Sequence, residues 1–244
     1  MASGNPLLND SATRRLSGAR TGSDVMTVEG TTNRALLLTA LLVISAGVTW
    51  NQVGQGTPAM GLALAGAIVG FILAITTSFK PMWAPYTSVP YAMAEGLFLG
   101  GFSVLMERQF PGMILQAVAL TMGTMFAFLA AYRTGLIKVT ARLRSVIMSA
   151  TMGIMLFYLA SIVLQMFKVP LPTFGGGGMI GIGISLLVCG VAAFNLLLDF
   201  DFIENGARQG LPKAFEWYGA FALLVTLVWL YIEMVRLLSR LRER

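Results

Sequence analysis

Seven long apolar segments place the strongest constraint on how this chain can fold. Most approach or exceed the length of about 20 residues that an α-helix needs to cross a bilayer. The expected spans are Ala35–Val53, Ala59–Phe79, Tyr91–Met106, Gly112–Tyr132, Ser145–Phe167, Met179–Phe200 and Trp217–Leu238. Because lipid satisfies no backbone hydrogen bonds, each segment must satisfy its own, and we predict an all-α integral membrane protein with seven transmembrane helices.

The composition supports this reading. Hydrophobic residues make up 56% of the 244 residues and charged residues only 11%, whereas soluble domains contain roughly 25% charged residues. The single cysteine, Cys189, lies inside an apolar run and has no partner for an intramolecular disulfide. The sequence therefore indicates a multi-pass membrane protein and carries no sign of an oxidising compartment.

The first 30 residues differ from the rest of the chain. They are polar, rich in Ser, Gly, Thr and Asn, and show no sustained periodicity. They also lack the pattern of a signal peptide, since the first apolar run begins only near Ala35. We predict a flexible polar tail at residues 1–30 and a seven-helix membrane domain at residues 31–244.

Basic residues predict the orientation. With alternating loops, one side of the membrane receives eleven lysines and arginines before the last segment, and the other side receives Arg108 and Lys168. This bias places the N-terminus in the cytoplasm. Four C-terminal arginines fall on the opposite side: Arg236, Arg240, Arg242 and Arg244. Either this tail does not follow the rule, or a segment near the C-terminus does not fully cross.

Several kinds of chemistry are excluded or disfavoured. The chain has no histidine, which rules out a zinc-protease helix, a Ser-His triad and a histidine proton relay. The glycine-rich run GGGGMIGIG leads directly into an apolar segment and has no nearby lysine, unlike a phosphate-binding loop. The net charge of +6 lies in the loops and tail, which favours contact with anionic lipid over nucleic acid. We therefore expect neither an enzyme nor a resident cofactor.

Three acids lie within or at the edge of apolar segments: Glu95, Asp199 and Glu233. A charged side chain at membrane depth costs about 2.5–3.5 kcal/mol on insertion scales, so such residues are functional candidates by default. The competing interpretation is structural, for example an ion pair between Glu233 and Arg236 one turn later. The predicted site consists of these three acids, with Arg236 as a secondary candidate.

Helical geometry separates the neighbouring acids of the sixth segment. Asp199 and Asp201 are two positions apart and point in directions about 200° apart. Asp201 shares its face with Glu204, Asn205 and Arg208, a polar stripe that we expect to be solvated. Asp199 shares its face with Asn195, which could supply a second oxygen. Asp199 is therefore the predicted inward residue, and Asn195 and Asp201 are secondary candidates.

Acids near the C-terminus of a helix also face the negative end of its dipole. An arginine, a proton or a metal cation should therefore compensate Asp199. Oxygen ligands alone suit Ca²⁺ better than zinc or copper. A carboxylate in apolar surroundings would also respond to protons, so it could act as a pH-sensitive latch.

Four stretches of the chain show a family resemblance. They read APYTSVPYAMAEGLFLGGFS, FPGMILQAVALTMGTMFAFLAAYRTGLIKVT, LLLDFDFIENGARQG and KAFEWYGAFALLVTLVWLYIEMVRLL. The chain from about residue 26 to its C-terminus resembles the bacterial branch of the Bax inhibitor-1/YccA-like family, most specifically in DFDFIE and EWYGAF. The resemblance implies a seven-helix bundle with the last helix central, in a bacterial inner membrane.

The same resemblance implies a function and a site. Characterised family members are pH-sensitive calcium leak channels whose latch is a pair of aspartates between the sixth and seventh helices. By this resemblance Asp199 and Glu233 would form the latch and could hold Ca²⁺. Here the second acid is a glutamate, and the two positions are 34 residues apart. They could meet only if residues 205–222 formed an inserted or re-entrant element.

The expected function is thus a pH-sensitive cation leak, with Ca²⁺ as the expected ion, Asp199 and Glu233 as the gate, and Glu95 along the pathway. Two alternatives remain open. One is a membrane-embedded protein that modulates a membrane protease, a quality-control machine or a stress response, with the N-terminal tail as the contact. The other is a proton-coupled carrier of a small solute.

Overall fold

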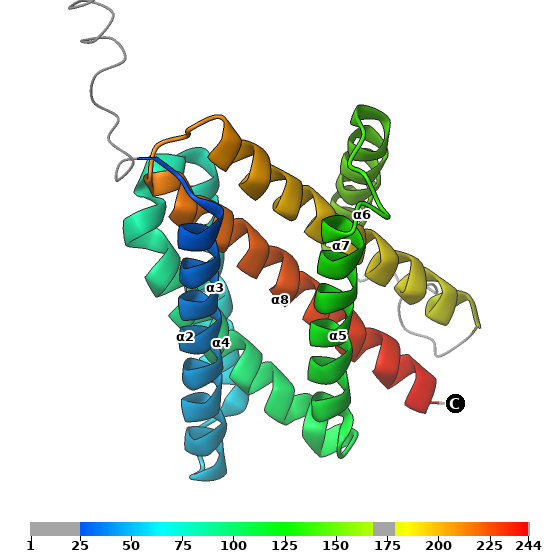
Figure 1. The fold of residues 1–244 in the computed structure, drawn as a ribbon. Helices are drawn as coiled ribbons and strands as arrows, with labels where there is room; N and C mark the ends of the chain where they lie inside the picture. The colour runs from blue at the N-terminus through cyan, green and yellow to red at the C-terminus, as the bar shows by residue number, and fades with distance from the viewer. Residues whose placement is uncertain (1–24, 168–178, 244) are drawn as a thin grey trace, which may run out of the picture.

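The computed structural model describes residues 25–167 and 179–243. Seven α-helices in these ranges are long and apolar enough to cross a membrane, which confirms the all-α, multi-pass architecture (Figure 1). They are α2 (Val28–Gly54), α3 (Ala59–Phe79), α4 (Ala84–Gln109), α5 (Met113–Arg133), α6 (Ala141–Met166), α7 (Met179–Arg208) and α8 (Ala214–Arg242), with a 3₁₀ turn, η2 (Pro81–Trp83), before α4.

Four helices extend well beyond the spans expected from hydropathy, and the first of them, α2, begins seven residues early, at Val28. Helix α4 begins at Ala84, with a proline in its first turn, where a missing backbone N–H costs nothing. Helix α7 continues past Phe200 to Arg208, and α8 begins at Ala214. Polar residues extend these helices at their ends, where side-chain partners from other helices are available.

Helix α8 is the centre of the bundle, as the family resemblance implied. It packs against α2, α4, α5 and α7, and Figure 1 shows it crossing the molecule diagonally behind α2 and α5. Its residues Ala220, Leu224, Leu230 and Val235 are at most 2% exposed. A helix surrounded in this way can bury charged side chains that a lipid-facing helix could not.

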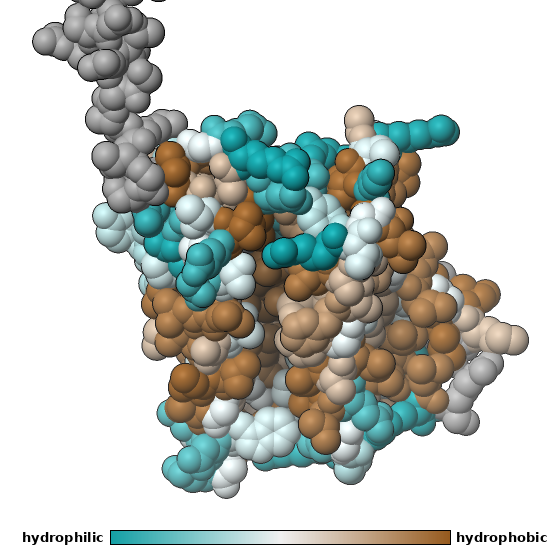
Figure 2. Space-filling view, in the orientation of Figure 1, coloured by the Kyte–Doolittle hydropathy of each residue, from teal (hydrophilic) through white to brown (hydrophobic). Residues whose placement is uncertain are grey.

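Helix α6 lies at the periphery. It packs chiefly against α7 and presents large apolar side chains outward, among them Met152, Leu156 and Ile162. A broad hydrophobic band separates the two polar ends of the molecule in Figure 2. The outer face of α6 therefore suits direct contact with lipid.

The chain entering α2 is anchored to the connection between α7 and α8. Val25 forms an antiparallel bridge with Pro212, and the Met26 amide donates to the Leu211 carbonyl at 2.7 Å. Thr27 then caps α2. Residues 25–30 of the predicted tail thus belong to the folded bundle, whereas residues 1–24 lie outside the described part of the chain.

The inserted or re-entrant element that a contact between Asp199 and Glu233 would require at residues 205–222 does not form. Helix α7 ends at Arg208, α8 starts at Ala214, and a short connection joins them, with Gly210 at a positive φ of 65°. Both helices are long enough to cross the membrane. Since consecutive long helices need only a tight turn, the 34-residue gap between Asp199 and Glu233 is taken up by helix rather than by an insertion.

Three of the four C-terminal arginines that disagreed with the orientation rule bind other parts of the protein, Arg236 through Glu233, whereas Arg244 lies outside the described residues. The Arg240 guanidinium donates to the Gly181 carbonyl and, at 2.8 Å, to the Ser185 hydroxyl. Arg242 donates to the Pro111 carbonyl at 2.7 Å. These charges bind the C-terminal end of α8 to neighbouring segments, which gives them a packing role whichever side of the membrane they occupy.

Candidate functional site

Helices α7 and α8 pair antiparallel in a register that two contacts define. The Arg240 guanidinium bonds the Ser185 hydroxyl near one end. Further along the pair, the Thr226 hydroxyl of α8 hydrogen-bonds the Asp199 carboxyl of α7. The same number of residues separates these contacts on both helices, so the pairing continues without a bulge between them.

Asp199 lies in the interior of α7 at this interface. Its Oδ2 atom is buried and has no hydrogen-bond partner among the described residues. Because α7 continues to Arg208, the expectation that Asp199 lies at a helix C-terminus was wrong, and the dipole argument built on it does not apply. Leu196, Phe200 and Ile203, near it on the same helix, are buried, and the Tyr218 phenol lies within electrostatic range.

Glu233 has a different environment. It is 1% exposed, and its Oε1 accepts hydrogen bonds from the Tyr158 hydroxyl of α6 at 2.8 Å and from Arg236 Nη1 at 3.0 Å. Arg236 also reaches the second carboxylate oxygen at 3.2 Å, and its guanidinium lies 5.1 Å from the centre of the Tyr158 ring. This is the structural ion pair considered as the alternative for Glu233.

The structure does not bring Asp199 and Glu233 together. In the α7–α8 register Glu233 lies opposite Ala192, seven residues from Asp199, or about 10 Å along the helix axis. Each acid has its own contacts. Among the described residues, no group of three or more Asp, Glu or Cys side chains gathers that could hold a metal ion.

Asp201 is not part of a solvated stripe, and that expectation was wrong. Asp201 is 9% exposed and forms an ion pair with Arg144 of α6. Glu204 accepts a hydrogen bond from the Tyr132 hydroxyl of α5 and pairs with Arg208. The polar end of α7 therefore binds α5 and α6, which explains why the helix persists through these acids.

The other two candidates also lie in separate surroundings. The Asn195 amide nitrogen donates to the Thr151 hydroxyl of α6 and to the Val191 carbonyl, each at 2.8 Å. Glu95 hydrogen-bonds Tyr91 one turn earlier on α4. It lies against α3, where a Cβ atom on Gly70 would approach its Oε1 to 2.8 Å. Neither side chain is placed beside Asp199 by these contacts.

Sequence reasoning missed a buried acid at the start of α8. Glu216 is 1% exposed and pairs with Arg34 of α2. Its Oε1 accepts hydrogen bonds from the Thr27 amide at 3.0 Å and the Thr27 hydroxyl at 2.9 Å. The available signal was an arginine at the start of the first apolar segment and an acid at the start of the last, on the same side of the membrane.

The comparisons with known proteins agree with this architecture. A family model described as Bax inhibitor 1 like matches residues 5–243, nearly the whole chain. Comparison with curated proteins and with solved structures gave no match. Since the match includes all seven helices, the chain belongs to the Bax inhibitor 1 like family.

Proposed function

We propose that this multi-pass membrane protein is a pH-sensitive cation leak channel, with Ca²⁺ as the permeant ion and Asp199 as the proton-binding gate. The observation that supports this best is the buried Asp199 Oδ2, which lacks a hydrogen-bond partner among the described residues. Within the proposal the protein resides in a bacterial inner membrane with a cytoplasmic N-terminus, as the basic residues indicate. No covalent chemistry is assigned to it.

The physical argument is one of compensation. A charged carboxylate in an apolar environment must find a counter-charge, bind a proton or reach water. Glu233 has its counter-charge in Arg236, so we assign it to holding α6 against α8. Asp199 accepts a hydrogen bond from the Thr226 hydroxyl and lies within electrostatic range of the Tyr218 phenol, but among the described residues no lysine or arginine pairs with it. A proton or a passing cation would supply the positive charge that Asp199 lacks. Because the two would compete for the same carboxylate, occupancy by the ion would depend on pH.

The test is calcium flux into liposomes that contain the purified protein and a trapped calcium dye. We expect the native protein to give different rates at about pH 5 and about pH 8. Asp199→Asn keeps the shape of the side chain but cannot titrate, so its rates at the two pH values should be equal. The matched control is Glu204→Gln, five residues further along α7, where the acid pairs with the exposed Arg208.

Two outcomes would contradict the proposal at different points. An absence of flux throughout this pH range would eliminate the leak channel. Flux whose pH dependence survives in Asp199→Asn would eliminate Asp199 as the gate while leaving the channel in place. Saturable counterflow of a small solute would instead favour the proton-coupled carrier. Modulation of a membrane protease stays a prediction, and a flux assay does not test it.

A further inference from the structure

A cavity of about 340 Å³ lies between α2, α4, α5 and α8, away from the acids discussed above. Its side walls include Val43 and Trp50 of α2 and Val118 and Met122 of α5, and its floor includes Leu99 of α4 and Leu224 of α8. Figure 2 shows the corresponding hollow running between the columns formed by α2 and α5. The cavity therefore opens sideways rather than toward either end of the bundle.

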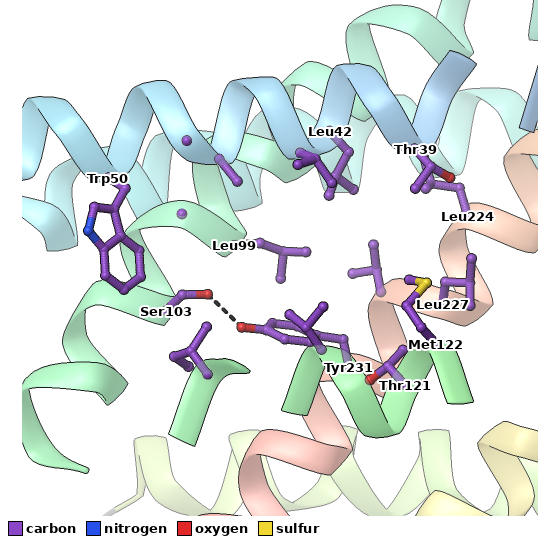
Figure 3. Close-up of a pocket in the computed structure, with 17 residues that line it drawn as sticks. Thr39, Leu42, Trp50, Leu99, Ser103, Thr121, Met122, Leu224, Leu227 and Tyr231 are labelled. Carbon is purple, nitrogen blue, oxygen red and sulfur yellow. Dashed lines mark hydrogen bonds between the residues drawn. The ribbon is translucent and has the colours of Figure 1, made fainter. Parts of the chain in front are cut away.

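The walls of this cavity are almost entirely apolar. Three of the hydroxyls that line it are bonded within the protein: the Ser103 and Tyr231 hydroxyls lie 2.7 Å apart, as Figure 3 shows, and the Thr121 hydroxyl donates to a backbone carbonyl at 2.8 Å. An apolar cavity of this kind offers water few partners. None of Glu95, Asp199 and Glu233 lines it, so it is not suited to ion passage.

The cavity has the length of one lipid leaflet. On α2 its lining runs from Thr39 to Trp50, about 16 Å along the helix axis at 1.5 Å per residue. Half of a hydrocarbon core of about 30 Å is about 15 Å. Trp50 lies near the end of α2, the level at which tryptophan side chains usually meet the membrane interface. The hollow thus extends from the middle of the bilayer to one surface.

The mouth faces hydrocarbon. Val43 and Val118 line it from α2 and α5 and are 61% and 42% exposed. A concave apolar site of a few hundred Å³ is typical of a ligand pocket. We propose that this pocket binds one acyl chain of a bilayer phospholipid, which enters sideways between α2 and α5 while the headgroup stays at the surface near Trp50.

A filling substitution tests the proposal. A Cβ atom on Gly47, which lines the cavity, meets nothing within 4 Å, so Gly47→Leu should occupy the pocket without displacing a helix. Gly153→Leu on α6 is the matched control, because that position is equally open and does not line the cavity. Native mass spectrometry should find one retained phospholipid fewer on Gly47→Leu than on the native protein or the control.

A second measurement locates the chain. The other three tryptophans, Trp83, Trp217 and Trp229, are replaced by phenylalanine to leave Trp50. Phospholipid with brominated chains should quench Trp50 fluorescence, and Gly47→Leu should reduce this quenching about twofold relative to Gly153→Leu. Brominated free fatty acid in an unbrominated bilayer should quench less than brominated phospholipid at the same mole fraction of bromine.

The outcomes separate clearly. Equal lipid retention and equal quenching in the two leucine variants would overturn the proposal, and stronger quenching by the fatty acid would overturn its assignment to phospholipid. If Gly47→Leu does not give monodisperse protein, Val118→Phe at the mouth replaces it. The readouts are independent of calcium flux, so the proposed channel function can fail without affecting this result.

Discussion

Asp199 and Glu233 occupy two levels of the same helix pair, about 10 Å apart along its axis, and their surroundings are opposite. Glu233 is enclosed by a tyrosine hydroxyl and a guanidinium. Asp199 receives one threonine hydroxyl and leaves Oδ2 without a hydrogen bond among the described residues. Two acids in similarly apolar sequence can therefore be a structural ion pair in one case and an uncompensated charge in the other.

The difference shows what a buried acid implies. A carboxylate that is paired and hydrogen-bonded stabilises its own arrangement, and removing its partner is costly. A carboxylate that lacks a partner weakens the fold when charged, so some other requirement must account for its presence. Stability measurements can therefore test the contrast between the two acids without assuming any transport activity.

The largest effect is expected at Glu233. Glu233→Gln leaves the Arg236 guanidinium without its counter-charge and should lower the free energy of unfolding by about 2 kcal/mol, less than for a fully buried pair because Arg236 is partly exposed. Thermal unfolding in detergent, followed by circular dichroism, measures this. Glu204→Gln keeps an oxygen that can accept from the Tyr132 hydroxyl and loses only the pair with the mostly exposed Arg208, so it should change stability by less than about 0.5 kcal/mol.

A double variant sharpens this result. If the ion pair is the cause, adding Arg236→Gln to Glu233→Gln should cost less than the sum of the two single substitutions, because both partners are then neutral. Additive losses would mean that the two side chains contribute separately, and the contrast with Asp199 would lose its basis.

Tyr158→Phe should have an intermediate effect. It removes the hydroxyl that donates to Glu233 at 2.8 Å and keeps the ring beside Arg236, so we expect a loss of about 1 kcal/mol. The same unfolding assay applies, with Tyr86→Phe as the control, since Tyr86 is 81% exposed. A loss as large as that of Glu233→Gln would assign the main stabilisation to the tyrosine.

The smallest effect is expected at Asp199. Asp199→Asn removes a charge whose Oδ2 has no described hydrogen bond, so stability at neutral pH should stay within about 0.5 kcal/mol of the native protein or rise slightly. The measurement is the same unfolding curve at pH 7. A loss comparable to that of Glu233→Gln would show that Asp199 has a stabilising partner after all, and the difference between the acids would disappear.

The sequence identified most residues of the candidate site, but it did not predict the side chains that contact them. Hydropathy and the cost of charge in lipid identified Glu95, Asp199 and Glu233, and an i, i+3 spacing suggested the pair with Arg236. The partners that decide their roles come from distant segments. Tyr158 of α6 reaches Glu233, and Arg144 of α6 pairs with Asp201. No local pattern in the sequence indicates which side chain of another helix will arrive there.

Helix ends were misjudged for a related reason. The acids after Phe200 resemble the polar end of a membrane segment, yet α7 continues to Arg208. Tyr132 of α5 and Arg144 of α6 supply hydrogen bonds and charge to those acids, so the helix remains favourable beyond its apolar run. Hydropathy measures transfer to lipid, and it cannot register groups that the rest of the protein provides.

By itself, the sequence determined that this protein is a bundle of seven long apolar helices. Lipid offers no hydrogen bonds to the backbone, and a helix satisfies its own. The resemblance implied a central last helix, but only the tertiary structure decided that α2, α4, α5 and α7 are the helices that enclose it. It also decided that Glu216 is buried against Arg34 and that Asp199 and Glu233 do not share a site. The apolar pattern of a helix predicts which of its faces avoid water. It does not predict whether such a face contacts lipid or another helix, because both are almost equally apolar. The choice among helix partners therefore depends on shape and on the few polar contacts that the assembled bundle brings together.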